Sequence, residues 1–423
     1  MADESKKIPR GKMFYQFSAY GFLKNLRFFD PFIILIFRSY GLSYLQIGVL
    51  YSIRDLATNI LEIPSGLLAD SFGRKKAMVG AFSSYILSFL ILYIFEDFWV
   101  LVLAMIIFAI GEALRSGTHK ALILEHLTIN HISDLKVAYY GLTRSASQMG
   151  SALNALIAAG LVFYTGNYRI MFLAATLPYA IDLVNLALYP AELDGKITPE
   201  PDSTIWECLK KTLVDFWGIF KEGGQLRPLL NSASYSGVFK TSKDYLQPVL
   251  AAMVLSAAAL PNLEKTRREA LIIGLVYFII YLLTSFASRR AYLLSNRFSS
   301  QVKAVNVTYL AGIGALLAAG ILTYLGQEIL AVLCFIGMFL INNVRRPINV
   351  GVISDQISSR IMASGLSAES QLTTLFSAAL APTLGFLVDK WGLGFGLSAL
   401  GTLMFLVYFP VRVLEQESSG TPK

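Results

Sequence analysis

Uncharged runs of membrane-spanning length recur along the sequence and constrain its fold more than any other feature. The clearest are residues 98–111, 270–285 and 391–411, which contain no Asp, Glu, Lys or Arg. A helix needs about 20 mostly apolar residues to cross a bilayer. The 423-residue chain is 55% hydrophobic and 15% charged, whereas a soluble domain carries about 25% charged residues. The pattern therefore predicts an all-α integral membrane protein rather than two or three soluble domains.

The apolar runs divide the chain into twelve predicted membrane spans. Their ranges are 13–37, 43–69, 77–95, 98–122, 137–163, 168–190, 228–257, 268–289, 302–323, 327–347, 366–388 and 392–412. The polar, basic residues 1–12 precede an apolar stretch that is too long for the core of a signal peptide. We therefore interpret that stretch as the first span and expect no cleavable signal.

Lys and Arg are distributed unevenly between alternate loops. With the N-terminus placed in the cytoplasm, 23 of the 36 Lys and Arg fall in cytoplasmic segments, 6 in outer segments and 7 within spans. Cytoplasmic loops of membrane proteins carry this excess. The distribution predicts both termini in the cytoplasm, with the protein in the cell (inner) membrane. It also accounts for the net charge of +8 without a nucleic acid partner.

A polar segment at residues 191–227 separates the first six spans from the last six. Some of its apolar residues recur at intervals of three and four, which predicts a short amphipathic helix on the cytoplasmic membrane surface. These residues are Trp206, Leu209, Leu213, Phe216 and Phe220. We expect a six-helix bundle at 1–190, a cytoplasmic linker at 191–227 and a second six-helix bundle at 228–423.

The loop after the second span reads GLLADSFGRKK at residues 66–76. It resembles the signature loop of the major facilitator superfamily, whose pattern is G-x-L-a-D-r-x-G-r-k/r. It also lies where that family has it, between spans two and three on the cytoplasmic side. Ser71 stands where the family often has Arg. The resemblance implies two six-helix halves built from inverted three-helix repeats, and a transporter, usually monomeric, that works by alternating access.

The signature loop has a weaker counterpart at the end of the eleventh span. Gly385, Asp389 and Gly392 have the same offsets as Gly66, Asp70 and Gly73 in the loop. By the span count, the two sets lie at opposite membrane faces. Inverted repeats predict that relationship, although chance is an alternative because Gly and Asp are common at span ends.

The residues of the loop have separate expected roles. Gly66 would let helices approach closely, Gly73 would allow a tight reversal, and Asp70 would meet a helix N-terminus or a basic group. Arg74 and Lys75 would stay in cytoplasmic water. In the family this loop holds the cytoplasmic side closed, so these five are the predicted gating residues. A basic turn that only fixes topology is the alternative.

Charged side chains within spans are costly and mark a pathway or a pair. The proton-coupling candidates are Glu62, Asp30, Glu112 and Arg115. The substrate-cavity candidates are Lys24, Arg27, Arg54, Asp55, Asn59, Arg144, Lys240, Lys243, Asp244 and Asn342. Spans one, four, seven and ten, which line the cavity in major facilitator proteins, carry many of them. Local ion pairs are the alternative for Arg27 with Asp30, Glu112 with Arg115, and Lys240 with Asp244.

Two further expectations concern the first and second spans. Lys24, Arg27 and Asp30 are three residues apart, so a continuous helix would place them on one face. Glu62 lies one turn before Gly66 in a polar helix face, where a carboxyl group can exchange protons. Our hypothesis is that Glu62 and Asp30 carry a proton and that Arg115 tunes them. Pairing of Glu62 with a nearby Arg is the alternative.

These features predict a secondary transporter of a small organic solute, coupled to protons and working as an efflux antiporter. Within the spans, cations and acids nearly balance. Adding Arg345 and Arg346 would make the cavity cationic, so an importer or exchanger of an organic anion is the alternative. Both arginines are equally well explained as cytoplasmic anchors.

A membrane sensor without transport activity, or a membrane enzyme, is a remote third possibility. The sequence has no His-Glu-x-x-His, Gly-x-Ser-x-Gly or P-loop motif. The spacing of its three His matches no common zinc pattern, and its two Cys indicate no disulfide framework. We therefore expect no enzyme activity, no cofactor and no metal site.

Overall fold

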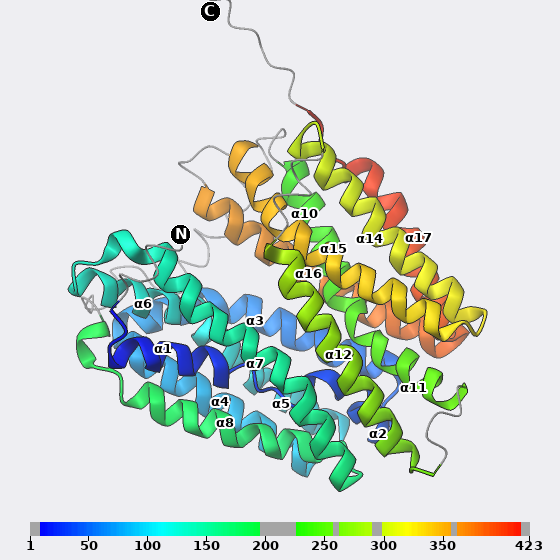
Figure 1. Ribbon diagram of the computed structural model, residues 1–423, viewed down its shortest axis with the longest axis horizontal. Coiled ribbons are helices and arrows are strands. Elements are labelled where there is room, and N and C mark those ends of the chain that lie inside the picture. The colour runs from blue at the N-terminus through cyan, green and yellow to red at the C-terminus, as the bar shows by residue number, and fades with distance from the viewer. Residues whose placement is uncertain (1–8, 195–225, 257–261, 290–297, 357–361, 416–423) are drawn as a thin grey trace, which may run out of the picture. The chain divides into compact units, whose positions relative to one another are not determined.

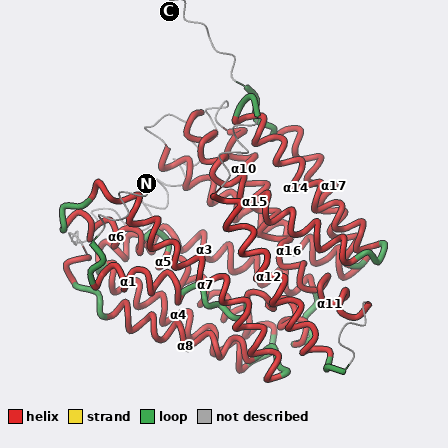
Figure 2. Tube along the Cα trace, in the orientation of Figure 1, coloured by secondary structure: helices red, strands yellow, loops and turns green. Residues whose placement is uncertain are grey.

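The computed structural model of the protein describes residues 9–194, 226–256, 262–289, 298–356 and 362–415. Within these ranges all regular structure is helical, and short loops join most of the helices (Figure 2). The predicted amphipathic helix of the linker lies outside the described residues. Only the start of the linker is described, where Ala191–Asp194 forms the short 3-10 helix η4.

Most helices follow the predicted spans to within a few residues. In the first half these helices are α3 (Tyr44–Phe72), α4 (Arg74–Ile94), α7 (Lys136–Thr165) and α8 (Ile170–Ala187), whereas α5 (Phe98–Arg115) and α6 (Thr118–Ile129) together replace the predicted fourth span. In the second half they are α12 (Lys265–Arg289), α14 (Gln301–Tyr324), α15 (Glu328–Gln356), α16 (Met362–Trp391) and α17 (Leu393–Val411). Nine helical segments of the described ranges are long and apolar enough to cross a membrane. The prediction of an all-α membrane protein is confirmed.

The first, fourth and seventh spans are interrupted, so the prediction of one continuous helix is wrong for all three. The fourth, predicted at 98–122, divides at Ser116 and Gly117 into α5 and α6, and α6 continues to Ile129. The first consists of α1 (Lys12–Leu23), a non-helical stretch at 24–29, η2 (Asp30–Phe32) and α2 (Ile33–Ser39). The seventh consists of α10 (Leu226–Ser242), η5 (Lys243–Tyr245) and α11 (Leu246–Ser256). Lys24, Arg27 and Asp30 therefore do not share one face of a regular helix.

A proline explains the interruptions of the first and seventh spans. Pro31 and Pro248 lack the N–H that would bond to the carbonyl four residues earlier, at Arg27 and Asp244, and their rings crowd that carbonyl. In the first span the carbonyl of Arg27 instead accepts a hydrogen bond from Asn154 Nδ2 at 3.1 Å. The carbonyl of Lys24 likewise accepts from the Tyr179 hydroxyl at 2.9 Å.

The described helices group into two compact units. The first comprises residues 1–211 with 250–282, and the second comprises 212–249 with 283–423. In the first unit α4 packs between α5 and α8, and α1 packs on α7 (Figure 1). In the second unit α10 packs on α16, and α14 packs against both α15 and α17. The boundaries between the units fall inside α11 and α12, and the predicted domains at 1–190, 191–227 and 228–423 stay a prediction.

Apolar side chains cover both the interior and the outer surface of the helices. Tyr85, Phe89 and Phe172 are buried in the first unit, whereas Leu177 and Leu275 are exposed although they are large and apolar. Exposed apolar residues recur along α8, α12 and α17. A water-soluble protein rarely exposes such continuous apolar surface, so these faces are suited to contact with lipid.

Candidate functional site

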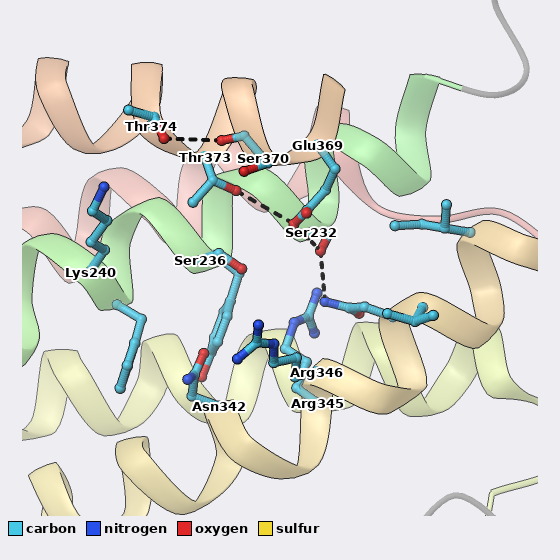
Figure 3. Close-up of a pocket in the computed structure, with 15 residues that line it drawn as sticks. Ser232, Ser236, Lys240, Asn342, Arg345, Arg346, Glu369, Ser370, Thr373 and Thr374 are labelled. Atoms are coloured by element: carbon cyan, nitrogen blue, oxygen red, sulfur yellow. Dashed lines mark hydrogen bonds between the residues drawn. The ribbon is translucent and has the colours of Figure 1, made fainter. Parts of the chain in front are cut away.

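A polar cavity of about 480 Å³ lies among α10, α15 and α16 of the second unit (Figure 3). Its polar uncharged lining residues are Ser232, Ser236, Asn342, Asn349, Ser370, Thr373 and Thr374. Its charged lining residues are Lys240, Arg345, Arg346 and Glu369. Of the predicted substrate-cavity residues, Lys240 and Asn342 line this space. Among the described residues, the lining therefore combines three cations with a single carboxylate.

Close packing of α10 against α16 forms one wall of the cavity. Gly237 lies at this contact, where an added Cβ would come within 2.6 Å of Phe376 Cβ. Any larger residue would push the two helices apart. Gly237 thus allows the close approach of α10 and α16, the helices that carry Lys240 and Glu369 in the cavity lining.

Glu369 is held by neutral groups from two of the helices that line the cavity. Its Oε1 accepts hydrogen bonds from Ser232 Oγ of α10 at 2.8 Å and from Thr373 Oγ1 at 3.4 Å. Ser232 Oγ in turn accepts from Asn349 Nδ2 of α15 at 3.0 Å (Figure 3). Within the described ranges Glu369 forms no ion pair, although three cations line the same cavity.

Arg345 is a cation buried inside the second unit, with 1% of its surface exposed. It donates hydrogen bonds to the Val305 carbonyl, to Thr308 Oγ1 at 3.1 Å and to Asn231 Oδ1. Its guanidinium also lies over the rings of Tyr235 and Tyr309, at 4.6 and 5.2 Å from their centres. Among the described residues no carboxylate pairs with it, so its positive charge is solvated only by dipoles and rings.

The structure thereby separates two arginines that the sequence did not distinguish. Arg345 is packed in the interior of the unit, which is not the environment of an anchor in cytoplasmic water. Its neighbour Arg346 is exposed and lines the cavity. Both contribute positive charge to the lining, so of the two alternatives for Arg345 its burial favours a place in the cavity over an anchor in cytoplasmic water.

A second charged cluster lies in the first unit, around Glu112 of α5. Its carboxylate accepts from Arg27 Nη2 at 2.5 Å and from Arg115 Nη2 at 2.6 Å. Arg27 Nε also donates to the Tyr179 hydroxyl at 2.7 Å, and Arg115 Nε donates to the Tyr85 hydroxyl at 3.0 Å. The predicted local pair of Glu112 and Arg115 is therefore present. Arg27, for which Asp30 was the predicted partner, forms its ion pair with Glu112.

Glu62 of α3 shares no described hydrogen bond or ion pair with the Glu112 cluster. Its carboxylate accepts a hydrogen bond from Ser116 Oγ at 2.5 Å. Ser116 belongs to the break between α5 and α6, at Gly117, whose φ is +74°. Because Arg115 bonds to Glu112, no described contact supports the predicted action of Arg115 on Glu62.

The remaining candidates are dispersed over both units. Arg54 pairs with its neighbour Asp55 at 3.0 Å, and Lys243 pairs with its neighbour Asp244 at 2.5 Å. Arg144 is exposed on α7. Lys24 lies at the end of α1 with its ammonium 5.2 Å from the centre of the Tyr20 ring, and Asn59 and Asp30 lie on α3 and η2. Within each unit, the described contacts do not join all the sequence candidates into one cluster.

The signature loop adopts the predicted reversal at Gly73, whose φ is +101°. Gly66 is exposed and has open space around it among the described residues, so no close helix approach is seen there and its predicted role stays a prediction. Two details differ from expectation. Lys75 is half-buried rather than in water, since its Nζ donates to the Tyr189 carbonyl at 2.7 Å, and Arg74 pairs with Glu125 at 3.6 Å. The side chain of the fifth gating residue, Asp70, lies outside the described part of the chain.

Asp194 of η4 supplies a contact that the sequence interpretation missed. Its Oδ1 accepts a hydrogen bond from the Lys75 backbone N–H at 2.7 Å. The carboxylate thereby meets the first turn of α4, where the helix dipole favours negative charge. Only its position just after the sixth span could have indicated this role, because the partner is far away in sequence.

We expect Gly73→Ala to lower the thermal stability of the protein. The φ of +101° strains any residue with a side chain, and the new Cβ would lie 2.9 Å from Asp194 Oδ2. Strain of this kind costs on the order of 1–3 kcal/mol. Thermal unfolding in detergent checks this, with Gly66→Ala as the matched control, because Gly66 has open space around it. Equal losses in the two variants would contradict the prediction.

The family model of the Major Facilitator Superfamily matches residues 14–368 of the chain. The protein belongs to this superfamily. Its members are transporters rather than enzymes, so the protein is a multi-pass membrane transporter. The resemblance drawn from the signature loop is confirmed.

One curated superfamily relative shares part of the sequence. It is the "Uncharacterized MFS-type transporter YxaM" of Bacillus subtilis (strain 168), which is 35% identical over 108 residues. That match covers 25% of this chain, and the chain spans about a quarter of the relative's length, 26%.

Solved structures of other superfamily transporters share the fold over nearly the whole chain. The nucleoside transporter NupG has a TM-score of 0.74 at 13% identity and covers 95% of this chain and 98% of its own. The peptide transporter POT has a TM-score of 0.71 at 15% identity, covering 97% and 96%. The D-xylose-proton symporter has a TM-score of 0.66 at 15% identity, covering 95% and 97%. At this identity the likeness shows the fold alone.

Proposed function

We propose that this protein is a proton-coupled secondary transporter of a small organic anion and works by alternating access. The observation that carries the proposal is the charge of the second-unit cavity, where Lys240, Arg345 and Arg346 outnumber Glu369. A cavity with this excess of positive charge attracts an anion more strongly than a neutral molecule or a cation. The proposal favours the organic-anion alternative among the sequence predictions.

The size and lining of the cavity support a small solute with several polar groups. A space of about 480 Å³ is within the range of small-molecule sites. Hydroxyl and amide groups such as those of Ser236, Asn342 and Thr374 can form hydrogen bonds with either charged or neutral groups of the solute. Phe239 and Val350 add apolar surface, so a carboxylate on a short organic frame fits best.

Coupling to protons is the second part of the proposal. The D-xylose-proton symporter shares the fold and couples its solute to protons, as its name states. Glu112 is held by two guanidinium groups, so it is poorly suited to release and rebind a proton. Of the sequence candidates, Glu62 and Asp30 remain proposed proton carriers. Efflux by antiport remains a prediction about direction, as do a monomeric state and cytoplasmic termini in the cell membrane.

Exchange in proteoliposomes tests the proposed solute class. Proteoliposomes that contain the purified protein would be loaded with unlabelled solute. Uptake of the labelled solute would then be followed without any pH gradient. The panel contains lactate, succinate and benzoate as anions, tetraphenylphosphonium as a cation, and xylose and uridine as neutral solutes. We expect exchange of at least one carboxylate and none of the cation. Exchange confined to the neutral or cationic solutes would overturn the proposal.

A further inference from the structure

Glu369 differs from every other charged group of the second-unit cavity in sign. Among the described residues that line the cavity it is the sole carboxylate. The charged groups that face it are Lys240 from α10 and Arg345 and Arg346 from α15, and α17 contributes no lining residue. Its protonation therefore changes the formal charge of the lining by one unit in a direction that favours anions.

Protonation of Glu369 would break fewer hydrogen bonds than protonation of Glu112. Glu112 accepts two charge-assisted hydrogen bonds from guanidinium groups, at 2.5 and 2.6 Å. Protonation would sacrifice both, and such bonds are about twice as strong as neutral ones. Glu369 accepts only from the hydroxyls of Ser232 and Thr373, both on Oε1. Its Oε2 forms no described hydrogen bond and can take a proton without breaking one.

The surrounding network also fixes the direction of the hydrogen bonds. Asn349 Nδ2 donates to Ser232 Oγ, so the hydroxyl hydrogen of Ser232 is directed to Glu369 Oε1. Asn349 and Ser232 are buried, with 6% and 4% of their surfaces exposed. These two hydrogen bonds, from Asn349 to Ser232 and from Ser232 to Glu369, hold the carboxyl group in place in both protonation states. Glu369 is therefore a carboxyl group held in a fixed position within the cavity.

We propose that Glu369 is the group through which proton binding and anion binding are linked in this cavity. This inference rests on the proposed function, since it assumes that an organic anion occupies the cavity. A proton on Glu369 removes the repulsion between its carboxylate and an incoming anion. Linkage is reciprocal, so a bound anion favours the protonated group by the same factor. The proton and the anion then bind together, so this inference favours symport over the efflux antiport predicted from the sequence.

The test compares exchange with pH-driven accumulation in Glu369→Gln. The probe is whichever of lactate, succinate or benzoate the wild-type protein exchanges. Because glutamine imitates the protonated carboxyl group, we expect Glu369→Gln to keep exchange but to lose accumulation driven by a pH gradient by at least about tenfold. Its exchange should also become independent of pH. Glu415→Gln, at an exposed carboxylate that accepts from Ser300, is the matched control and should behave as wild type.

Each result decides between the inference and the proposed function. Wild-type protein that exchanges no carboxylate overturns the proposed function. Exchange by wild type together with normal pH-driven accumulation by Glu369→Gln overturns the inference alone. Should Glu369→Gln fail to assemble, Ser232→Ala keeps the carboxyl group and removes its hydroxyl donor. We expect Ser232→Ala to change the pH at which uptake is half-maximal, and an unchanged pH profile would overturn the inference.

Discussion

Glu112→Gln should strongly destabilise the first unit. Arg27 and Arg115 both donate to this carboxylate, and their side chains are 23% and 25% exposed. Without Glu112 the guanidinium groups of Arg27 and Arg115 lose the carboxylate that both of them contact. Removing one partner of a buried ion pair costs about 3–5 kcal/mol, and the partial exposure here lowers our expectation to about 3 kcal/mol.

Thermal unfolding of the purified protein in detergent measures this loss. The double variant Glu112→Gln/Arg115→Gln has the same net charge in the cluster as the wild type, so it should recover at least half of the loss. Glu264→Gln serves as the control, because its ion pair with Arg267 is exposed and should contribute no more than about 0.5 kcal/mol. An equally low stability of the single and double variants would show that charge does not explain the cluster.

Glu112 also shows what the sequence could predict about this protein. The pair of Glu112 and Arg115 is local, three residues apart on one helix, so its spacing alone indicated a contact. Arg27 approaches from a segment 85 residues away, where Pro31 has interrupted the helix. Helical spacing predicted a partner for Arg27 at Asp30, because it assumed a regular helix that the proline does not allow.

The spans themselves were predictable because each one needs only a local property. Apolar runs of sufficient length and the excess of cytoplasmic Lys and Arg define α4, α7, α8 and α12 to within a few residues. The sequence prediction was least accurate for the spans that contain charged residues. In these spans the hydropathy pattern does not show whether the backbone stays helical. The seventh span was predicted as one continuous helix, yet the 3-10 helix η5, which begins at Lys243, divides it into α10 and α11.

The candidate site needed the structure because its parts come from three helices. Lys240 and Asn342 were predicted as cavity residues from their charge or polarity within spans, and both line the cavity. Glu369 was only one of several membrane acids in the sequence. What distinguishes it is the set of hydroxyl donors and the three nearby cations, and neither is visible from neighbouring residues.

The largest effect on transport is expected from removing the two accessible cations of the cavity. Lys240 lies two turns along α10 from Ser232, and Arg346 is exposed on α15 (Figure 3). At a separation of about 6–8 Å and an effective dielectric constant of about 20, each unit charge interacts with an anion by about 2–3 kcal/mol. A loss of 1.4 kcal/mol is about tenfold in affinity. We therefore expect Lys240→Gln/Arg346→Gln to raise the KM for the transported carboxylate by about 100-fold or more.

Charge, rather than shape, should decide this outcome. Lys240→Arg/Arg346→Lys keeps both charges while changing both side chains, so it should retain most of the affinity. Lys390→Gln removes a cation at the other end of α16, where it lies over Trp391, and should leave the KM unchanged. Because Arg345 stays buried in all three variants, the measurement isolates the accessible charges. If the charge-preserving variant loses as much affinity as the neutral one, the cavity recognises its solute by shape and hydrogen bonds, and the anion proposal fails.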